Sequence, residues 1–459
     1  MSTLDPTALS QLIASLPASV VVVEQATLEN YRFDWSRDQS AGTPLAVVRP
    51  ENAEQVQTVL RWASGRRIPV VPRGAGSGLS GGSSAVDGGV VLSMEKMRAI
   101  EIDTATRVAV VEPGAFNAEV KAAAAALGLW YPPDPSSYEI CSIGGNIATN
   151  AGGLCCVKYG VTTDYVLGLD VVLADGTKIT LGGKRIKDVA GLSLLKLFVG
   201  SEGTLGVVTR AILRLIPAQP ARSTLVAAFP TVAAAADAVV AIGATLRASM
   251  MELMDQASIN AVENYRPMGL DRSAGAMLLT QSDAPGDARA LEIMAMEAAC
   301  ELAGAKEVFV TDDPDEGELF VAARRAAFPA VEALGTLLLE DVGVPVPLLP
   351  ELLAGIANIA STHDTEVPVV AHAGDGNTHP LVVYDPTDEE ARVRAYEAFD
   401  DIMALAISLG GTITGEHGVG RAKKAALPDQ LGPDVMALTR TIKNALDPQG
   451  ILNPGVILS

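Results

Sequence analysis

Residues 72–83 read PRGAGSGLSGGS, a glycine-rich stretch between two short apolar runs. Gly76, Gly78 and Gly81 match the GxGxxG spacing of a dinucleotide-binding loop. A Rossmann fold requires a helix directly after such a loop, so that the helix N-terminus faces the pyrophosphate. Here the next residues, SSAVDGG, are turn formers, and a strand follows. The Rossmann interpretation therefore fails, whereas successive backbone N–H groups still predict an anion-binding nest.

Two further glycine-rich segments follow in the same half of the chain. Residues 142–153 read SIGGNIATNAGG, and residues 200–206 read GSEGTLG. Glycine lets a flat ligand or another backbone approach closely, and Asn146 and Asn150 offer amide donors and acceptors. Three such segments, with Arg73 as a positive charge beside the first, predict a long ligand lying along the backbone.

The composition excludes several classes of protein. Of the 459 residues, 49% are hydrophobic and 19% charged, which excludes a disordered chain. The net charge of −20 argues against nucleic-acid binding, because that function needs a basic surface, and we expect no nucleic-acid partner. The apolar run 12–23 is too short to span a bilayer, and no basic residue precedes it as in a signal peptide. The four cysteines lack CxxC spacing and suit a reducing compartment. We expect a soluble, cytoplasmic protein that contacts membranes only through a partner.

Apolar periodicity predicts two domains of mixed α+β structure. Expected strands in the first domain are 45–49, 68–72, 89–94, 107–112, 169–174 and 206–215. Expected helices are 117–127 and one after Pro50 that buries Val56, Val59, Leu60 and Ala63. Pro217 and Pro220 indicate a domain boundary.

After that boundary the pattern changes to the β-α-β-β-α-β order of a ferredoxin-like layer. The expected elements are strand 223–229, helix 231–247, strands 249–254 and 274–280, helix 287–303 and strand 307–311. Further helices are expected near 316–333, 348–360, 387–408 and 433–446. We therefore expect an N-terminal helical segment over 1–39, domains over 40–219 and 220–420, and a C-terminal segment over 421–459 that returns to the first domain.

A histidine-containing hairpin is predicted over residues 367–384, VPVVAHAGDGNTHPLVVY. The sequence GDGN is a strong turn signal, and His372 and His379 lie symmetrically about it. On paired strands they would face each other on one side of the sheet. Two opposed imidazoles suit either a shared metal ion or a stacked polar pair.

Residues 411–420, GTITGEHGVG, place Glu416 and His417 next to each other in a glycine-rich loop. Neighbours on an extended backbone point in opposite directions, so one residue can bind a metal while the other faces a substrate. Two histidines and one carboxylate would leave open positions on a metal, as catalytic sites require. His363 lies outside these motifs and is expected at the surface.

The ordered set PRGAGSGLSGGS, PPDPSS, SIGGNIATNAGG, KYG and GSEGTLGVVT resembles the FAD-binding domain of the vanillyl-alcohol-oxidase flavoprotein family. The C-terminal motifs resemble its D-lactate dehydrogenase, glycolate oxidase and D-2-hydroxyglutarate dehydrogenase branch, and the match spans residues 40–459. This resemblance implies a two-subdomain (PCMH-type) FAD-binding domain, a ferredoxin-like substrate (cap) domain and a C-terminal helical segment. It also implies oxidation of a small D-2-hydroxy acid to the 2-oxo acid, with hydride transfer to flavin N5.

The resemblance implies specific contacts to FAD. The pyrophosphate would lie on Pro72, Arg73, Gly74, Ala75, Gly76, Ser77, Gly78 and Leu79. The ribityl chain and isoalloxazine would lie on Pro133, Asp134, Ser142, Gly145, Asn146, Thr149 and Gly152. Glu202, Gly203 and Val208 would hold the adenosine end, and Asn453 would approach the flavin. No histidine precedes His363, so a histidyl link in this domain is impossible; a link through Cys155 or Cys156 is not expected, and FAD should be bound non-covalently.

The resemblance assigns His372, His379 and Glu416 to a divalent metal, with Zn²⁺ favoured over Mn²⁺ and Fe²⁺. It assigns acid–base chemistry to His417 and the substrate carboxylate to Arg324. Arg325, its neighbour, suits a solvated helix charge as well as a site residue. The segment 339–345, LEDVGVP, has apolar residues where many relatives carry a basic or hydroxyl group that binds a second substrate carboxylate. Burying an unpaired charge is costly, so glycolate or D-lactate is favoured over a dicarboxylate.

Three alternatives remain open. A metallohydrolase could use His372, His379 and Glu416, but it would leave the glycine-rich segments unexplained. The chain could instead be the flavoprotein subunit of a glycolate oxidase-like complex, or a D-2-hydroxyglutarate dehydrogenase. Without cluster-ligating cysteines, electrons must leave to a quinone, a cytochrome, an electron-transfer flavoprotein or an iron–sulfur subunit. The expected partners are thus a small 2-hydroxy acid, that external acceptor and a second copy in a homodimer.

Overall fold

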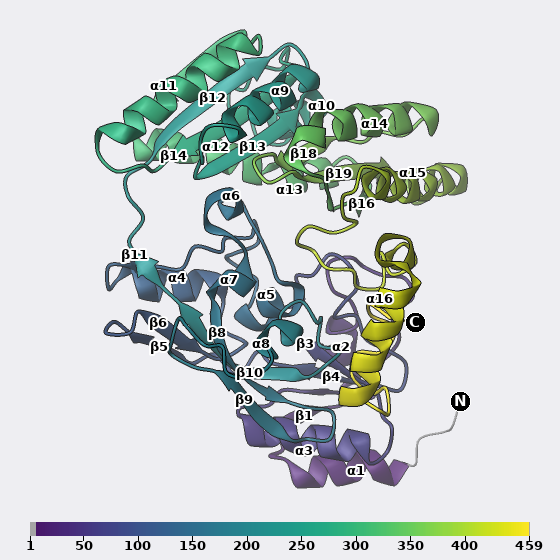
Figure 1. The fold of residues 1–459 in the computed structure, drawn as a ribbon. Coiled ribbons are helices and arrows are strands. Elements are labelled where there is room, and N and C mark those ends of the chain that lie inside the picture. Colours follow the sequence, from purple (N-terminus) through teal and green to yellow (C-terminus); the bar gives the residue numbers. More distant parts are fainter. Residues whose placement is uncertain (1–5, 459) are drawn as a thin grey trace. The chain divides into compact units, whose positions relative to one another are not determined.

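The computed structural model describes residues 6–458, and the chain divides into two units that alternate along the sequence (Figure 1). The first unit comprises Met1–Gly152, Val161–Ala218 and Glu416–Ser459; the second comprises Gly153–Gly160 and Gln219–Gly415. The observed division after Ala218 lies one residue from the boundary expected at 219. Two segments differ from the expectation: residues 153–160 were expected in the first domain but belong to the second unit, and residues 416–420 were expected in the second domain but belong to the first unit. Residues 1–5 and 459 of the expected terminal segments lie outside the described residues.

A small, mainly parallel sheet in the first unit carries the glycine-rich loop. Its strand order is β1 (Val21–Val22), β2 (Ala46–Val48), β4 (Val90–Ser93) and β3 (Val70–Arg73). Strands β2, β4 and β3 are parallel, which explains their continuous valine-rich sequences. Helix α3 (Ala53–Ser64) begins at Asn52, whose side chain accepts a hydrogen bond from the Gln55 N–H, and it buries the predicted apolar face.

A five-stranded antiparallel sheet forms the rest of the first unit's core. Its order is β5 (Ile100–Asp103), β6 (Val108–Val111), β10 (Val207–Arg214), β8 (Val166–Val172) and β9 (Lys178–Gly182). The edge strand β5 was not predicted, because it is only four residues long and its two isoleucines alternate with acidic residues. The unit also contains α1 (Pro6–Ser15), α2 (Gln25–Asn30), α4 (Asn117–Ala125), β7 (Leu129–Trp130), α5 (Ile143–Thr149), α7 (Thr162–Tyr165), α8 (Leu195–Phe198), β11 (Ile216–Pro217) and α16 (Leu427–Leu446).

The second unit has the predicted ferredoxin-like layer. Strands β12 (Ser223–Phe229), β13 (Met250–Asp255), β14 (Ala276–Ser282) and β15 (Glu307–Thr311) pair antiparallel in the order β15-β12-β14-β13. Helices α9 (Val232–Gly243) and α11 (Asp287–Leu302) pack together against it. The sequence analysis missed α10 (Gln256–Tyr265), which begins where the Asp255 carboxylate accepts a hydrogen bond from the Ser258 N–H.

Further strands and helices extend this layer. Strand β18 (Val369–His372) pairs with β13, and β19 (Asn377–Tyr384) pairs with β18, β16 (Thr336–Leu339) and β17 (Val342–Gly343). The remaining elements are α6 (Cys156–Tyr159), α12 (Pro314–Arg325), α13 (Ala327–Glu332), a 3₁₀ turn (Val346–Leu348), α14 (Leu349–Thr362) and α15 (Glu389–Ser408). Among the described residues, none of the helices has the length and apolar character needed to cross a membrane.

Residues 153–160 belong to the second unit because polar side chains attach them to the end of β14. The Asp283 carboxylate accepts hydrogen bonds from Lys158 Nζ and from the Tyr159 hydroxyl. Gln219 Nε2 donates to the same carboxylate at 3.3 Å. Burial alone would raise the pKa of Asp283, but these donors outweigh it and lower the pKa. No local pattern in KYG reveals such a distant acceptor.

Candidate active site

The glycine-rich loop after β3 is held against the N-terminal end of α5. A Cβ atom added to Gly74 would lie 2.3 Å from Ser142 Oγ and 3.2 Å from the backbone N of Gly145, so this position requires glycine. Ser142 Oγ accepts hydrogen bonds from the backbone N–H groups of Ala75 (3.1 Å) and Gly145 (3.3 Å). The first two glycine-rich segments therefore meet at Ser142.

The third glycine-rich segment joins the other two. The Glu202 N–H donates a hydrogen bond to the Ala148 carbonyl in α5 at 2.8 Å. Gly203 has a φ of +70°, and a Cβ atom there would lie 3.1 Å from Pro72 Cγ at the start of the first loop. All three segments are thus in contact within the first unit.

The guanidinium of Arg73 binds backbone carbonyl oxygens near the first loop. Arg73 is 8% exposed, and its guanidinium donates hydrogen bonds to the carbonyl oxygens of Phe33 (2.9 Å) and Ser83 (3.1 Å). Gly76 has a φ of +76°, and a Cβ atom there would lie 2.1 Å from Arg73 Nη2. The positive charge predicted beside the loop is therefore present, but its N–H groups are directed at these carbonyl oxygens.

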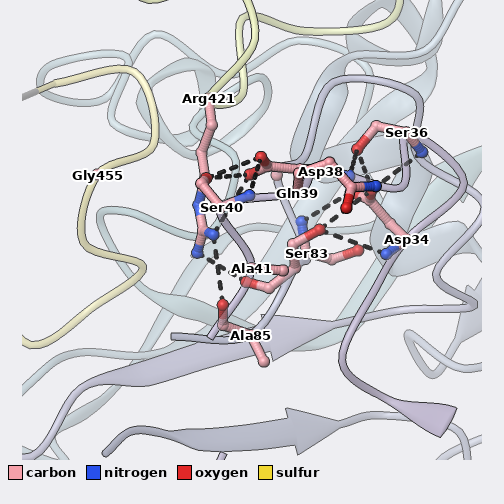
Figure 2. Close-up of polar contacts among 12 residues, drawn as sticks. Asp34, Ser36, Asp38, Gln39, Ser40, Ala41, Ser83, Ala85, Arg421 and Gly455 are labelled. Carbon is pink, nitrogen blue, oxygen red and sulfur yellow. Dashed lines mark hydrogen bonds and ion pairs between the residues drawn. The ribbon is translucent and has the colours of Figure 1, made fainter. Parts of the chain in front are cut away.

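Arg421 and two aspartates hold the far end of the same loop (Figure 2). Arg421 Nη2 donates a hydrogen bond to the Ser84 carbonyl at 2.7 Å, and Nη1 lies 3.6 Å from Asp38 Oδ2. Asp34 Oδ2 accepts a hydrogen bond from the Ser83 N–H at 3.2 Å. Three segments that are distant in the sequence are joined here.

Glu202 binds the C-terminal segment through its carboxylate. Oε1 accepts a hydrogen bond from the Val419 N–H and Oε2 one from the Gly420 N–H, both at 2.8 Å. Burial raises the pKa of the Glu202 carboxyl to about 7, although these two hydrogen bonds act in the opposite direction. Besides the role predicted for it at the adenosine end of FAD, Glu202 therefore fastens residues 416–420 to the first unit.

Asn453 completes this cluster with the left-handed backbone conformation, at a φ of +43°. Its Nδ2 donates hydrogen bonds to the carbonyl oxygens of Gly82 and Glu202, both at 2.7 Å. Its Oδ1 is buried and accepts no hydrogen bond from any described residue. The other residues predicted to contact the ring or ribityl chain, together with Val208, also belong to the first unit: Pro133, Asp134, Asn146, Thr149 and Gly152.

In the second unit, His372 and His379 lie on one face of the β18–β19 hairpin. Their ring centroids are 5.0 Å apart with an interplanar angle of 87°, and both side chains are buried. They are diagonal neighbours, because His372 pairs with Asn377 and His379 pairs with Val370. The expectation of directly opposed residues was wrong in register, since the turn spans residues 373–376 and centres the pairing one residue earlier.

Buried carboxylates surround these two imidazoles. His372 Nδ1 lies 2.8 Å from Glu252 Oε1 and 3.0 Å from Oε2, and Glu252 is the direct cross-strand partner of His372. Asp341 Oδ1 lies 3.6 Å from His379 Nδ1. Glu252, Glu340 and Asp341 have almost no exposed surface. None of the three was predicted as a site residue, although a single acid in the apolar strand MMELM requires a polar partner.

The structure separates the two neighbouring arginines at the end of α12. Arg324 is 4% exposed, and its Nε lies 3.0 Å from Glu252 Oε2. Arg324 Nη2 is buried and has no hydrogen-bond partner among the described residues. Arg325 instead forms an ion pair with Glu318 at 3.2 Å on the outside of the helix. Arg324 is thus the residue adjacent to the histidine pair.

Glu416 and His417 begin the C-terminal segment of the first unit. The preceding residue, Gly415, belongs to the second unit and donates its N–H to the Asp341 carbonyl at 3.0 Å. The His417 carbonyl accepts a hydrogen bond from Ser80 Oγ at 3.1 Å. Within the first unit, His417 is therefore attached to the glycine-rich loop through its backbone.

His363 was expected at the surface, but its side chain is only 14% exposed. Its Nε2 lies 2.8 Å from Asp401 Oδ2, and its Nδ1 lies 3.6 Å from Glu397 Oε2. These contacts join the end of α14 to α15, so His363 has a structural environment apart from the other three histidines.

Comparison with known proteins identifies the family. Residues 44–182 match a family described as "FAD binding domain", and residues 218–457 match one described as "FAD linked oxidases, C-terminal domain". The chain belongs to the FAD-linked oxidases. Its relatives include "Glycolate oxidase subunit GlcD" of Bacillus subtilis (strain 168), 42% identical over 93% of this chain and 91% of the relative. They also include "D-lactate dehydrogenase" of Archaeoglobus fulgidus, 36% identical over 93% of this chain and 95% of the relative.

Solved structures share the fold of this FAD-linked oxidase at low sequence identity. A p-cresol methylhydroxylase with bound substrate has a TM-score of 0.79 and 18% identity, with 98% of this chain and 96% of the other covered. A 4-ethylphenol oxidase from Gulosibacter chungangensis has a TM-score of 0.78 and 19% identity, with the same coverage. The predicted α+β fold and the family resemblance are therefore confirmed. The chain is an FAD-linked oxidoreductase, which removes the metallohydrolase alternative.

The residues of the first unit fit FAD. Glycine at positions 74 and 203 keeps side chains away from the joined loops, which leaves backbone N–H groups for phosphate oxygens. The buried Asn453 Oδ1 is an acceptor that a donor group on a bound ligand would satisfy.

In the second unit, His372 and His379 fit a divalent metal, because their nearest ring nitrogens lie within 4.8 Å of each other. The Glu252 carboxylate at His372 Nδ1 favours the tautomer whose Nε2 can act as a metal ligand.

Proposed function

We propose that this FAD-linked oxidase oxidises a small D-2-hydroxy acid of the glycolate or D-lactate type to the 2-oxo acid. The observation that carries this proposal is the buried Arg324, whose Nη2 has no partner among the described residues and which shares Glu252 with His372. An unpaired guanidinium edge beside two imidazoles suits a carboxylate next to a reacting hydroxyl. Relatives named as a glycolate oxidase subunit and a D-lactate dehydrogenase support the same substrate class.

His372, His379 and Glu416 would hold a divalent metal, for which Zn²⁺ is our first proposal and Mn²⁺ or Fe²⁺ the alternatives. Two buried imidazoles from one hairpin supply ligands of the kind that all three ions accept. Glu416 directly follows Gly415, whose N–H is bonded to Asp341. When bound, such an ion would polarise the substrate hydroxyl and favour loss of its proton.

The reaction divides between the side chains and the flavin. Arg324 binds the substrate carboxylate and fixes the position of C2. His417 accepts the hydroxyl proton, a task that suits an imidazole because it changes charge near neutral pH. Non-covalently bound FAD would accept the hydride from C2, and loss of this hydride and of the hydroxyl proton leaves a carbonyl group at C2.

The residues near His379 favour a substrate with a single carboxylate. Glu340 and Asp341 are fully buried there, and Val342 and Val344 are at most 5% exposed. A second substrate carboxylate would meet buried negative charge instead of a basic partner. D-2-hydroxyglutarate is therefore the weaker candidate.

The electrons then pass to an external acceptor, which we propose is a quinone, a cytochrome, an electron-transfer flavoprotein or an iron–sulfur subunit. Relatives named "Glycolate oxidase subunit GlcD" support a partner protein in this role. The four free cysteines support a reducing compartment, and we propose the cytoplasm.

Anaerobic flavin reduction tests the proposed reaction. The purified holoenzyme is mixed with glycolate, with both enantiomers of lactate and with both enantiomers of 2-hydroxyglutarate, and loss of the visible flavin absorbance is followed. Rapid loss is expected with glycolate or D-lactate, and little with L-lactate or 2-hydroxyglutarate. A flavin that stays oxidised with every 2-hydroxy acid would refute the proposal.

A further inference from the structure

Glu252 lies at the centre of the second unit's sheet, between two residues from distant parts of the chain. Oε1 is 2.8 Å from His372 Nδ1, and Oε2 is 3.0 Å from Arg324 Nε. The carboxylate has no exposed surface, and its strand neighbours Met251 and Leu253 are buried apolar residues. A single acid therefore contacts one residue proposed to bind the metal and one proposed to bind the substrate.

The position of Glu252 is unfavourable unless its partners are present. A buried carboxylate must recover its lost hydration from close donors. Replacing a buried ion pair by apolar residues is often neutral or stabilising, so stability alone is a weak explanation for this arrangement. The contacts of Glu252 indicate instead that its carboxylate orients His372 and Arg324.

Each partner contacts Glu252 through one edge only. A carboxylate at Nδ1 of His372 favours the proton on that nitrogen, so that Nε2 is the nitrogen suited to bind a metal. The ion pair at Arg324 Nε fixes one edge of the guanidinium, while Nη2 remains buried and without a partner among the described residues. Because both contacts involve the same carboxylate, the imidazole and the guanidinium keep a fixed separation.

We propose that Glu252 is a positioning residue that sets the metal-binding nitrogen of His372 and the carboxylate-binding edge of Arg324 relative to each other. This role rests on the proposed function of the two partners. Glu252 itself touches neither substrate nor metal. It acts through His372 and Arg324 together, so its loss weakens two kinds of binding at once.

The test is Glu252→Gln, which keeps the side chain's size but places an amide N–H₂ against one of two donors. Chelator-treated enzyme is titrated with Zn²⁺, and bound metal is measured after gel filtration. We expect the Zn²⁺ affinity to fall about 10–100-fold. The KM for glycolate or D-lactate in flavin reduction should rise about tenfold, as for one lost charge-assisted hydrogen bond. FAD content should stay unchanged, because the predicted FAD residues belong to the first unit.

Glu263→Gln is the matched control. Glu263 is a buried acid of the same unit, and its Oε1 accepts hydrogen bonds from the N–H groups of Met268 and Leu270, not from His372 or Arg324. Its variant should keep wild-type Zn²⁺ affinity and KM. If Glu252→Gln does not fold, Glu252→Asp replaces it, since the shortened carboxylate should reach only one partner and weaken one of the two kinds of binding.

The outcomes separate the two proposals. Two results together would overturn the proposed function and with it the role of Glu252. The wild-type enzyme would bind no Zn²⁺, and the Arg324→Ala variant would reduce its flavin as well as the wild type does. A different pair of results would overturn only the positioning role. The wild type would bind Zn²⁺ and depend on Arg324 for flavin reduction, while the Glu252 variant would equal the wild type in Zn²⁺ affinity and KM.

Discussion

The carboxylate of Glu202 accepts the backbone N–H of Gly420 at 2.8 Å and that of Val419 at the same distance. This acid lies in the GSEGTLG segment, and its partners lie two and three residues after His417. Gly418 must be glycine for this contact, because its φ is +87° and a Cβ atom would lie 2.9 Å from Glu202 Oε1. The residue proposed as the base is therefore anchored on the same framework as the FAD loops.

The raised pKa of Glu202 predicts a dependence of stability on pH. The folded carboxyl has a pKa of about 7 against an ordinary value of 4.5, so the folded state holds this proton more tightly than the unfolded chain. The stabilising contribution is complete below 4.5 and is lost as the pH rises through about 7. Urea unfolding followed by flavin fluorescence should show this decline in the wild type relative to Glu202→Gln, which cannot titrate. A constant difference between the two proteins across that range would refute the assignment.

The close approach at Gly74 predicts a specific loss of cofactor. In Gly74→Ala the new methyl group would lie 2.3 Å from Ser142 Oγ, so the loop and α5 must separate. We expect purified Gly74→Ala to contain far less FAD than wild type, measured as flavin absorbance per mole of protein. Gly65→Ala is the control, because Gly65 has an ordinary φ of −62° and the nearest atom to an added Cβ is 3.4 Å away. Full FAD content in Gly74→Ala would contradict the contact.

His417 and His363 provide a matched pair of histidine variants. His417→Ala should keep its FAD, because the loop is held by backbone contacts to Glu202 and Ser80, and should lose about 10²–10⁴-fold in the rate of flavin reduction. His363→Ala loses the contacts to Asp401 and Glu397 at α15 and should retain the wild-type rate. Stopped-flow measurement of flavin reduction distinguishes the two. Equal rates in both variants would exclude His417 as the base.

The sequence predicted those parts of the fold that depend on local patterns. Strand β12 has the bounds expected for it, and α3 buries the four residues of its predicted stripe. Helix α10 was missed because its ten residues follow β13 without a break, and only the Asp255 cap marks its start. Register failed at the histidine hairpin because GDGN marks a turn without specifying which residue pair closes it.

Contacts between distant segments could not be read from the sequence. The exchange of residues 153–160 into the second unit depends on Asp283, more than 120 positions away from Lys158 and Tyr159. Glu252 likewise becomes a site residue only when β18 and α12 are both in place. Family motifs supplied the candidate histidines and Arg324, whereas the carboxylates that orient them required the three-dimensional structure.

The contrast between Arg324 and Arg325 gives the most direct test of substrate binding. Arg324→Lys keeps the positive charge but cannot offer the planar fork that binds a carboxylate through two N–H groups. We expect the KM for glycolate or D-lactate to rise about tenfold or more, with FAD and metal content near wild type. Arg325→Lys should change KM less than about twofold, because Arg325 pairs with Glu318 in a partly exposed ion pair. Because the two variants make the same chemical change at adjacent positions, equal KM values would show that burial beside Glu252 gives Arg324 no part in binding the substrate.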